Sequence, residues 1–102
     1  MEAVLSHDEF NQYINTKFQI KIDDQRAVEL ELTEVSDLKL SPRQEEFAVT
    51  FRGPVAMFLG QGLRPFTHEQ MGEFELFLVP IGKDESGFNY EAVFNRIREA
   101  TT

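Results

Sequence analysis

The sequence predicts a mainly β fold, a small antiparallel barrel or sandwich of about six strands with a short N-terminal helix, in a single domain over residues 1–102. Short segments alternate apolar and polar residues with a period of two, turn residues separate them, and one helix-start signal stands near the N-terminus. We favour a barrel because many of the ten phenylalanines fall on one side of single strands, and because closure removes exposed edges. A two-sheet sandwich remains open. In a barrel, the helix could close one open end.

The helix is predicted over 6–14 from its capping residues. Ser6 stands three positions before Glu9, which is the spacing of a capping box. Leu5 and Phe10 flank this cap at the spacing of a hydrophobic staple. Such a short helix needs packing against the rest of the fold to persist.

The first half of the chain then predicts two antiparallel strands. Apolar residues recur at every second position over 16–22 and again over 28–33, with a polar loop at 23–26 that is too short for a crossover. After Thr33 the alternation slips by one residue, which predicts a bulge or bend. The polar stretch 36–46 is expected to be a surface excursion.

The second half predicts further strands joined by turns. We expect strands at 47–51, 63–68, 72–82 and 88–95. Pro65 weakens the second of these and suits an edge or end position. The third becomes continuously apolar through Ile81, so both of its faces are expected to be covered at that end.

Composition and charge argue against several classes of function. The net charge of −8 opposes binding to nucleic acid or to an anionic membrane surface. The chain has no cysteine, and its two histidines show no metal-ligand spacing, so neither a metal site nor a cofactor is expected. His68 and Glu69 lack a suitably spaced serine or carboxylate partner, so we expect no catalytic residue and no enzyme. No signal peptide or long apolar run is visible, which favours a soluble cytoplasmic protein and leaves signal-independent export open.

Four segments resemble a small bacterial family that is classed as a domain of unknown function. They are FRGP at 51–54, LGQG at 59–62, THEQMGEFELFLVPI ending at Ile81, and YEAVFN at 90–95. The resemblance covers the second half well, whereas the first half agrees mainly in its apolar pattern. It implies no catalytic activity. It does imply an accessory or assembly role beside phage-tail-collar-like or fibre proteins.

Six residues are candidates for binding a partner protein: Met57, Phe58, Leu59, Gln61, Glu73 and Glu75. The three apolar residues stand in a loop rich in glycine and proline. They are expected to form a lid on the core, with an exposed partner-binding loop as the alternative. Gln61 would hydrogen-bond loop backbone. The two glutamates lie on the outward phase of their strand, where they form a solvated surface or dock a basic partner.

The function expected from these features is a non-enzymatic interaction or assembly module, with a protein as its partner. The alternative is a small β-barrel that binds an apolar ligand, although the phenylalanines would then have to leave space inside. Self-association through an edge strand is also possible.

Overall fold

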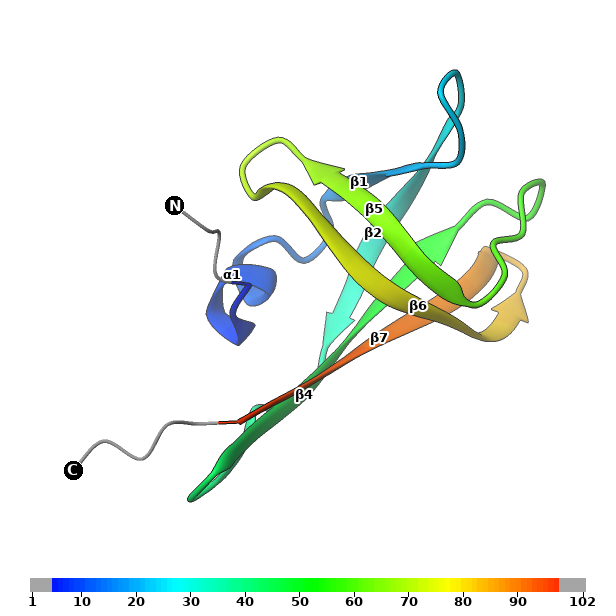
Figure 1. Cartoon of the computed structure of the whole chain (residues 1–102). Coiled ribbons are helices and arrows are strands. Elements are labelled where there is room, and N and C mark those ends of the chain that lie inside the picture. Colours follow the sequence, from blue (N-terminus) through cyan, green and yellow to red (C-terminus); the bar gives the residue numbers. More distant parts are fainter. Residues whose placement is uncertain (1–4, 98–102) are drawn as a thin grey trace.

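The computed structural model describes residues 5–97 and forms a closed barrel (Figure 1). The elements are α1 (His7–Gln12), β1 (Lys17–Lys21), β2 (Ala27–Val35), β3 (Lys39–Ser41), β4 (Gln44–Gly53), β5 (Gly62–His68), β6 (Gly72–Asp84) and β7 (Gly87–Ile97). The strand order is β2-β1-β5-β6-β7-β4-β3. An additional pairing of β2 with β4 closes every strand except β3 into a ring. The predicted barrel is thus confirmed over the sandwich, and β3 extends one side.

The first hairpin follows the predicted register. β1 and β2 pair antiparallel from Lys17↔Glu31 to Lys21↔Ala27, which places Phe18 and Ile20 inside and their neighbours outside. The predicted phase slip is also present, because the β2–β4 register shifts between Leu32 and Glu34. This irregularity lets β2 leave β1 and turn across to β4, so it contributes directly to closing the ring.

Two boundaries differ from the prediction. The helix ends at Gln12 and Tyr13 caps it, after which Asn15 adopts a left-handed backbone (φ 71°). Within the expected surface excursion 36–46, β3 forms a short hairpin with the start of β4. The sequence pattern did not predict β3 because all three of its residues are exposed. A strand is recognised by alternation of buried apolar and exposed polar residues, and β3 has no such alternation.

β5 is not an edge strand, because it pairs with both β1 and β6. Its pairing with β1 covers only Gln19↔Thr67 and Ile20↔Phe66, so Pro65 lies just past the end of that ladder. Pro65 lies in the middle of β5, so the end-position interpretation is wrong. The strand as a whole is not an edge, but at Pro65 it pairs with β6 alone among residues 5–97.

The core consists of inward side chains from every strand of the ring. Phe18, Phe51 and Phe66 are at most 1% exposed, and their ring centroids lie 5.1–6.4 Å apart. Centroid separations in this range favour aromatic pairing over loose contact. The phenylalanines thus fill the barrel from within.

The helix closes a gap in the ring, which we call the seam. β6 and β7 pair only from Val79 to Asp84 and diverge beyond, with α1 lying between the separated strands (Figure 1). Phe10 of α1 is fully buried there, with its ring 6.1 Å from Phe74 of β6 and 5.3 Å from Phe94 of β7. The helix therefore fills a gap in the wall of the barrel between β6 and β7, which corrects the expectation that it closes an open end.

The far end of β6 is covered on one face only. Phe77 and Ile81 are each 52% exposed, whereas Leu78 is fully buried. The expectation that both faces are covered there is wrong. A continuous apolar run indicates two covered faces only if a second layer packs outside the sheet. None of residues 5–97 forms such a layer over Phe77 and Ile81.

Candidate interaction surfaces

The loop 54–61 has an inner side that closes the barrel end. Leu59 is 4% exposed, and its backbone N–H donates to the buried Tyr90 hydroxyl at 2.9 Å. Met57 is half-buried and packs against the same core. These two residues are a lid, which explains why an irregular segment carries such apolar side chains.

The same loop has an outer side. Phe58 is 55% exposed and rests edge-on against Phe88, with 4.9 Å between ring centroids. Val55 is 49% exposed, and Gln61 is exposed as well. The guanidinium of Arg64 donates to the Gly60 carbonyl at 2.7 Å, and this bond anchors the end of the loop to β5. Of the predicted loop candidates, only Phe58 and Gln61 are therefore accessible to a partner.

A second exposed apolar site lies on the outer face of β5 and β6. Leu63 and Phe77 are 60% and 52% exposed and stand directly opposite each other in the β5–β6 register. The next outward pairs along the strands are Pro65↔Glu75 and Thr67↔Glu73. We call Leu63, Phe77, Pro65, Glu73 and Glu75 the β5–β6 face.

Sequence analysis identified only the two glutamates of this face. Leu63 and Phe77 each fall on the outward phase of a strand whose inward phase, Phe66 and Leu78, is buried. A large apolar residue at an outward position of a strand was thus the signal by which the sequence could have indicated this face. For Phe77 the signal was missed because the apolar run ending at Ile81 was interpreted as covered on both faces.

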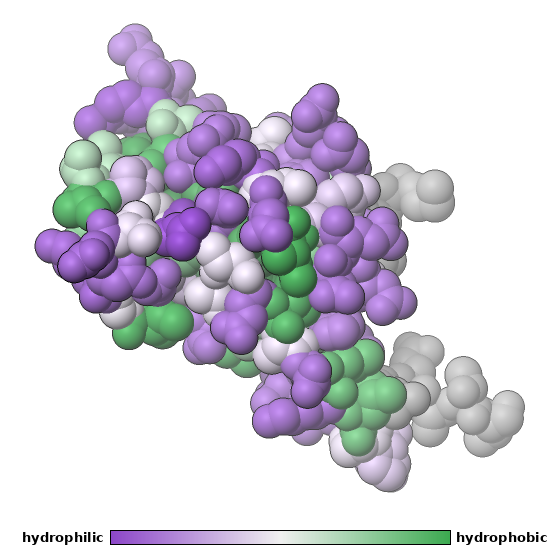
Figure 2. Space-filling model, turned by 180° about the vertical axis from the view of Figure 1, so that it is seen from behind, coloured by the Kyte–Doolittle hydropathy of each residue, from purple (hydrophilic) through white to green (hydrophobic). Residues whose placement is uncertain are grey.

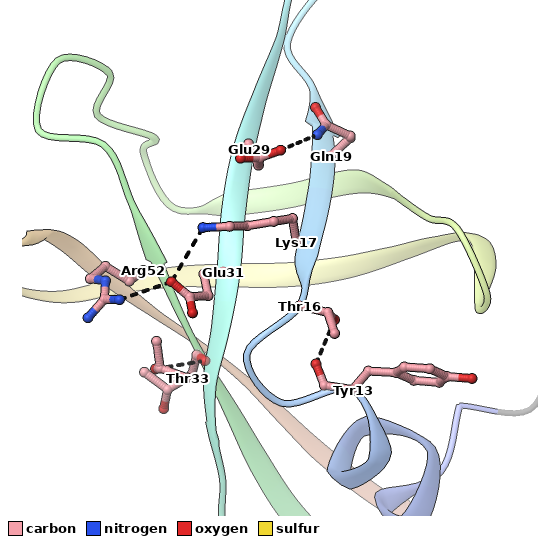
Figure 3. Close-up of polar contacts among 9 residues, drawn as sticks. Tyr13, Thr16, Lys17, Gln19, Glu29, Glu31, Thr33 and Arg52 are labelled. Atoms are coloured by element: carbon pink, nitrogen blue, oxygen red, sulfur yellow. Dashed lines mark hydrogen bonds and ion pairs between the residues drawn. The ribbon is translucent and has the colours of Figure 1, made fainter.

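The outward glutamates differ in their surroundings. Glu31 on β2 accepts from Arg52 at 3.0 Å and from Lys17 at 3.4 Å (Figure 3). The hydrogen bond from Arg52 is the main reason why the pKa of the Glu31 carboxyl lies below its ordinary value, and burial partly opposes it. Glu29 accepts from Gln19 at 3.0 Å on the same surface. These carboxylates are therefore already engaged within the chain.

Glu73 and Glu75 have no such partners among residues 5–97. Both side chains are exposed, and no ion pair joins either to a described cation. They border a shallow hollow of about 380 Å³, whose one cation, Lys21, lies 3.8 Å from Asp24. The β5–β6 face thus combines exposed apolar surface with uncompensated negative charge.

His68 serves the fold and has no free nitrogen. It is 4% exposed, and its Nδ1 accepts the backbone N–H groups of Gln70 at 3.1 Å and Met71 at 3.2 Å. Its Nε2 lies 3.0 Å from Thr16 Oγ1, which itself donates to the Tyr13 carbonyl at 2.6 Å. The single Thr16 hydroxyl proton is thereby used, so Nε2 carries the imidazole proton and donates it to Thr16. Burial lowers the pKa of His68 below its ordinary value of 6.5, and Glu69 opposes this shift.

Two kinds of feature were sought in the described part of the chain, a cluster of metal-ligating side chains and a membrane-spanning helix. No group of three or more His, Asp or Glu residues is placed to hold a metal ion within residues 5–97. The helix seen there, α1, is far too short to cross a bilayer. Seen from behind, the surface is mainly hydrophilic and its hydrophobic side chains gather in separate areas (Figure 2).

Comparison with known proteins identifies the family. The model of the family described as Domain of unknown function (DUF6916) matches residues 5–94, which is most of the chain. No curated protein and no solved structure matches. The chain therefore belongs to this family of unknown function.

Proposed function

We propose that this chain is a non-catalytic module that binds another protein through its β5–β6 face. The observation that carries the proposal is the pair Leu63 and Phe77, two large apolar side chains more than half exposed and directly opposed on neighbouring strands. The inward residues already fill the barrel, so these side chains are not needed for its core. Full burial of an exposed side chain of this size contributes about 1.5–3 kcal/mol, and roughly half of that remains to be gained at each of these half-exposed residues. The pair is therefore a suitable centre for an interface.

The charges around the pair define the chemistry of the partner. Glu73 and Glu75 have no ion pair within residues 5–97 and stand on the same face as Leu63 and Phe77. A partner with an apolar contact flanked by Lys or Arg would be electrostatically complementary to this arrangement. Nucleic acid would meet a chain of net charge −8 and is not proposed as the partner.

The partner class suggested by the sequence resemblance is a phage-tail-collar-like or fibre protein, which makes the chain an accessory or assembly factor. A rigid barrel suits such a role because its outward side chains are held in fixed positions without any folding on binding.

Binding of an apolar ligand inside the barrel is a weaker alternative. Ten core side chains, including Tyr90 and three phenylalanines of the ring, are less than 2% exposed. A ligand would have to displace them, since close-packed interiors leave little free volume. Detection of a co-purifying ligand by native mass spectrometry would favour this alternative.

The proposal is tested by affinity capture from the native host with four tagged single-site variants. Leu63→Ser and Phe77→Ser alter the β5–β6 face. Leu40→Ser on β3 is the matched control, because Leu40 is 58% exposed and its loss is equally mild for the fold. Phe58→Ser, at 55% exposure, tests the outer side of the loop as the competing surface.

We expect one stoichiometric partner to be captured by the unaltered chain and by Leu40→Ser, and to be lost with Leu63→Ser and Phe77→Ser. Loss with Phe58→Ser alone would move the interface to the loop. Equal capture by all four variants would refute both surfaces, provided that thermal unfolding shows each variant to be folded.

A further inference from the structure

The outward residues of β6 form a single row along the strand, which we call the β6 row. It consists of Glu73, Glu75, Phe77, Val79 and Ile81, which alternate with inward residues such as the buried Leu76 and Leu78. Four members of the row are exposed and Val79 is half-buried. Along the strand, a carboxylate half is thus followed by an apolar half.

The apolar half of the row is narrow. On β5, Leu63 stands opposite Phe77, whereas the β7 residue opposite Val79 is Glu91. A partner sheet would pack by covering apolar residues on several neighbouring strands. The β6 row and Leu63 instead offer a strip that fits one rod-shaped element.

This strip offers side chains and no backbone hydrogen bonds. The N–H and C=O groups of paired strands point toward the neighbouring strand and not out of the sheet, and residues 62–68 pair with residues 72–78. An extended peptide laid over this face would leave its own backbone groups partly dehydrated and without partners. An α-helix satisfies its backbone groups internally, so it can lie on the face without that penalty.

A helix also matches the spacing of the row. Alternate residues of a strand lie about 6.6 Å apart, and residues i and i+4 of a helix lie about 6 Å apart. At about 3.3 Å per residue, the row from Glu73 to Ile81 is about 26 Å long, which is the length of about 17 helical residues. Successive side chains on one stripe of a helix can therefore meet successive members of the row.

Charge defines the composition of that stripe. Glu73, Glu75 and the neighbouring Glu91 have no ion pair among residues 5–97. Lys21, which borders the same hollow as the first two, lies 3.8 Å from Asp24. The charges on and beside the row are therefore negative and uncompensated, and Lys or Arg side chains are complementary to them.

We propose that the partner segment bound by the β5–β6 face is an amphipathic α-helix that lies along the β6 row; this inference rests on the proposed function. One stripe of the helix carries Lys or Arg over about two turns, opposite Glu73 and Glu75. The following turns carry apolar residues, opposite Phe77 and Ile81 and beside Leu63. The chain thus recognises a helix by one face, with anchors one turn apart.

The test is photocrosslinking in the native host with mapping of the crosslinked partner residues by mass spectrometry. A photoreactive amino acid replaces Ile81 in one variant and Thr67 in another. Thr67 is exposed and stands opposite Glu73, so both carboxylates of the row are kept. We expect both positions to crosslink to one segment of one protein, at residues about 17 apart.

The other outcomes separate this inference from the proposed function. Crosslinked residues only about 8 apart would indicate an extended segment, and crosslinks to two unconnected segments would indicate a globular surface. Either result overturns the helix and leaves a protein-binding face in place. Silence at both positions overturns the helix, and silence at position 63 as well overturns the proposed function with it.

The charge of the stripe is tested with the purified partner that the crosslinks identify. Glu75→Gln should weaken its affinity several-fold at low salt, and the difference should shrink as salt is added. Glu85→Gln is the matched control, because Glu85 is also exposed and lies in the β6–β7 turn, away from the row. Equal affinities of the two variants would overturn the cationic half of the helix.

Discussion

Replacing His68 should destabilise the barrel in a way that depends on pH. His68 is the last residue of β5, and its imidazole joins two other parts of the fold. Nδ1 accepts from the β5–β6 turn, and Nε2 bonds Thr16, which follows the capped end of α1. In His68→Ala the N–H groups of Gln70 and Met71 lose their acceptor. Each buried group without a partner costs about 1–3 kcal/mol. Because water can reach the exposed Gln70 more easily than the buried Met71, we expect a total loss of about 2–4 kcal/mol.

His68→Asn is the informative companion variant. Its side-chain oxygen can accept from the same turn N–H groups, as asparagine commonly does in turns, so most of that stability should remain. What disappears is the titrating group. Comparing the two variants separates the hydrogen bonds of the turn from the protonation of the ring.

The pH dependence has a defined sign. The pKa of His68 is lowered in the folded protein, so the unfolded chain binds the proton first as the pH falls. Stability should therefore decline from about pH 6.5 downward, until the pH falls below the folded pKa. Glu69 is the one charged group that shifts this pKa, and it raises it. The other side chains that contact the ring are those of Tyr13, Thr16 and Phe18.

Urea denaturation of the unaltered chain and of both variants, from pH 8 downward, measures these effects. The free energy of unfolding of the unaltered chain should fall relative to His68→Asn as the solution becomes acidic. If the free energies of unfolding of the two proteins changed with pH in the same way, the lowered pKa of His68 in the folded protein would be refuted. A His68→Ala variant as stable as the unaltered chain would refute the role of the turn hydrogen bonds.

Three further substitutions test the packing of the fold, each by chemical denaturation. Phe10→Ala should cost about 3–5 kcal/mol, because a fully buried ring is removed from the seam; a loss below 1 kcal/mol would contradict its place there. Tyr90→Phe should cost about 1–3 kcal/mol by leaving the buried Leu59 N–H without an acceptor, and unchanged stability would show that water replaces the hydroxyl. Gly87→Ala should destabilise strongly, because its φ is +142° and an added Cβ would lie 2.0 Å from the Gly53 carbonyl oxygen; a fully stable alanine variant would disprove this geometry.

Local patterns in the sequence were sufficient for much of the fold. Alternation identified the buried Phe18 and Ile20 of β1, the capping residues identified α1, and the slip after Thr33 marked the β2 irregularity. These signals work because each is set by whether a side chain meets the core or water, within a few residues. Closure of the ring by β2–β4 pairing is non-local, so only the preference for a barrel, and not its strand order, could be predicted.

The candidate site was predicted in part for a related reason. Patterning placed Glu73 and Glu75 outside, and they are exposed. It treated Met57, Phe58 and Leu59 as one unit, although the loop turns Leu59 inward and leaves Phe58 outside. Whether an apolar residue in a loop or on an outward phase is covered depends on the neighbouring strands, and no short stretch of sequence contains that information.

The most direct test of the proposed function is a photocrosslinking measurement in the native host. A photoreactive amino acid is placed at Leu63 on the β5–β6 face and, in a separate variant, at the equally exposed Leu40 on β3. Our account predicts a discrete crosslinked species containing a second protein from position 63 and none from position 40. No crosslink at position 63, or the same species from both positions, would contradict a protein-binding role for the β5–β6 face.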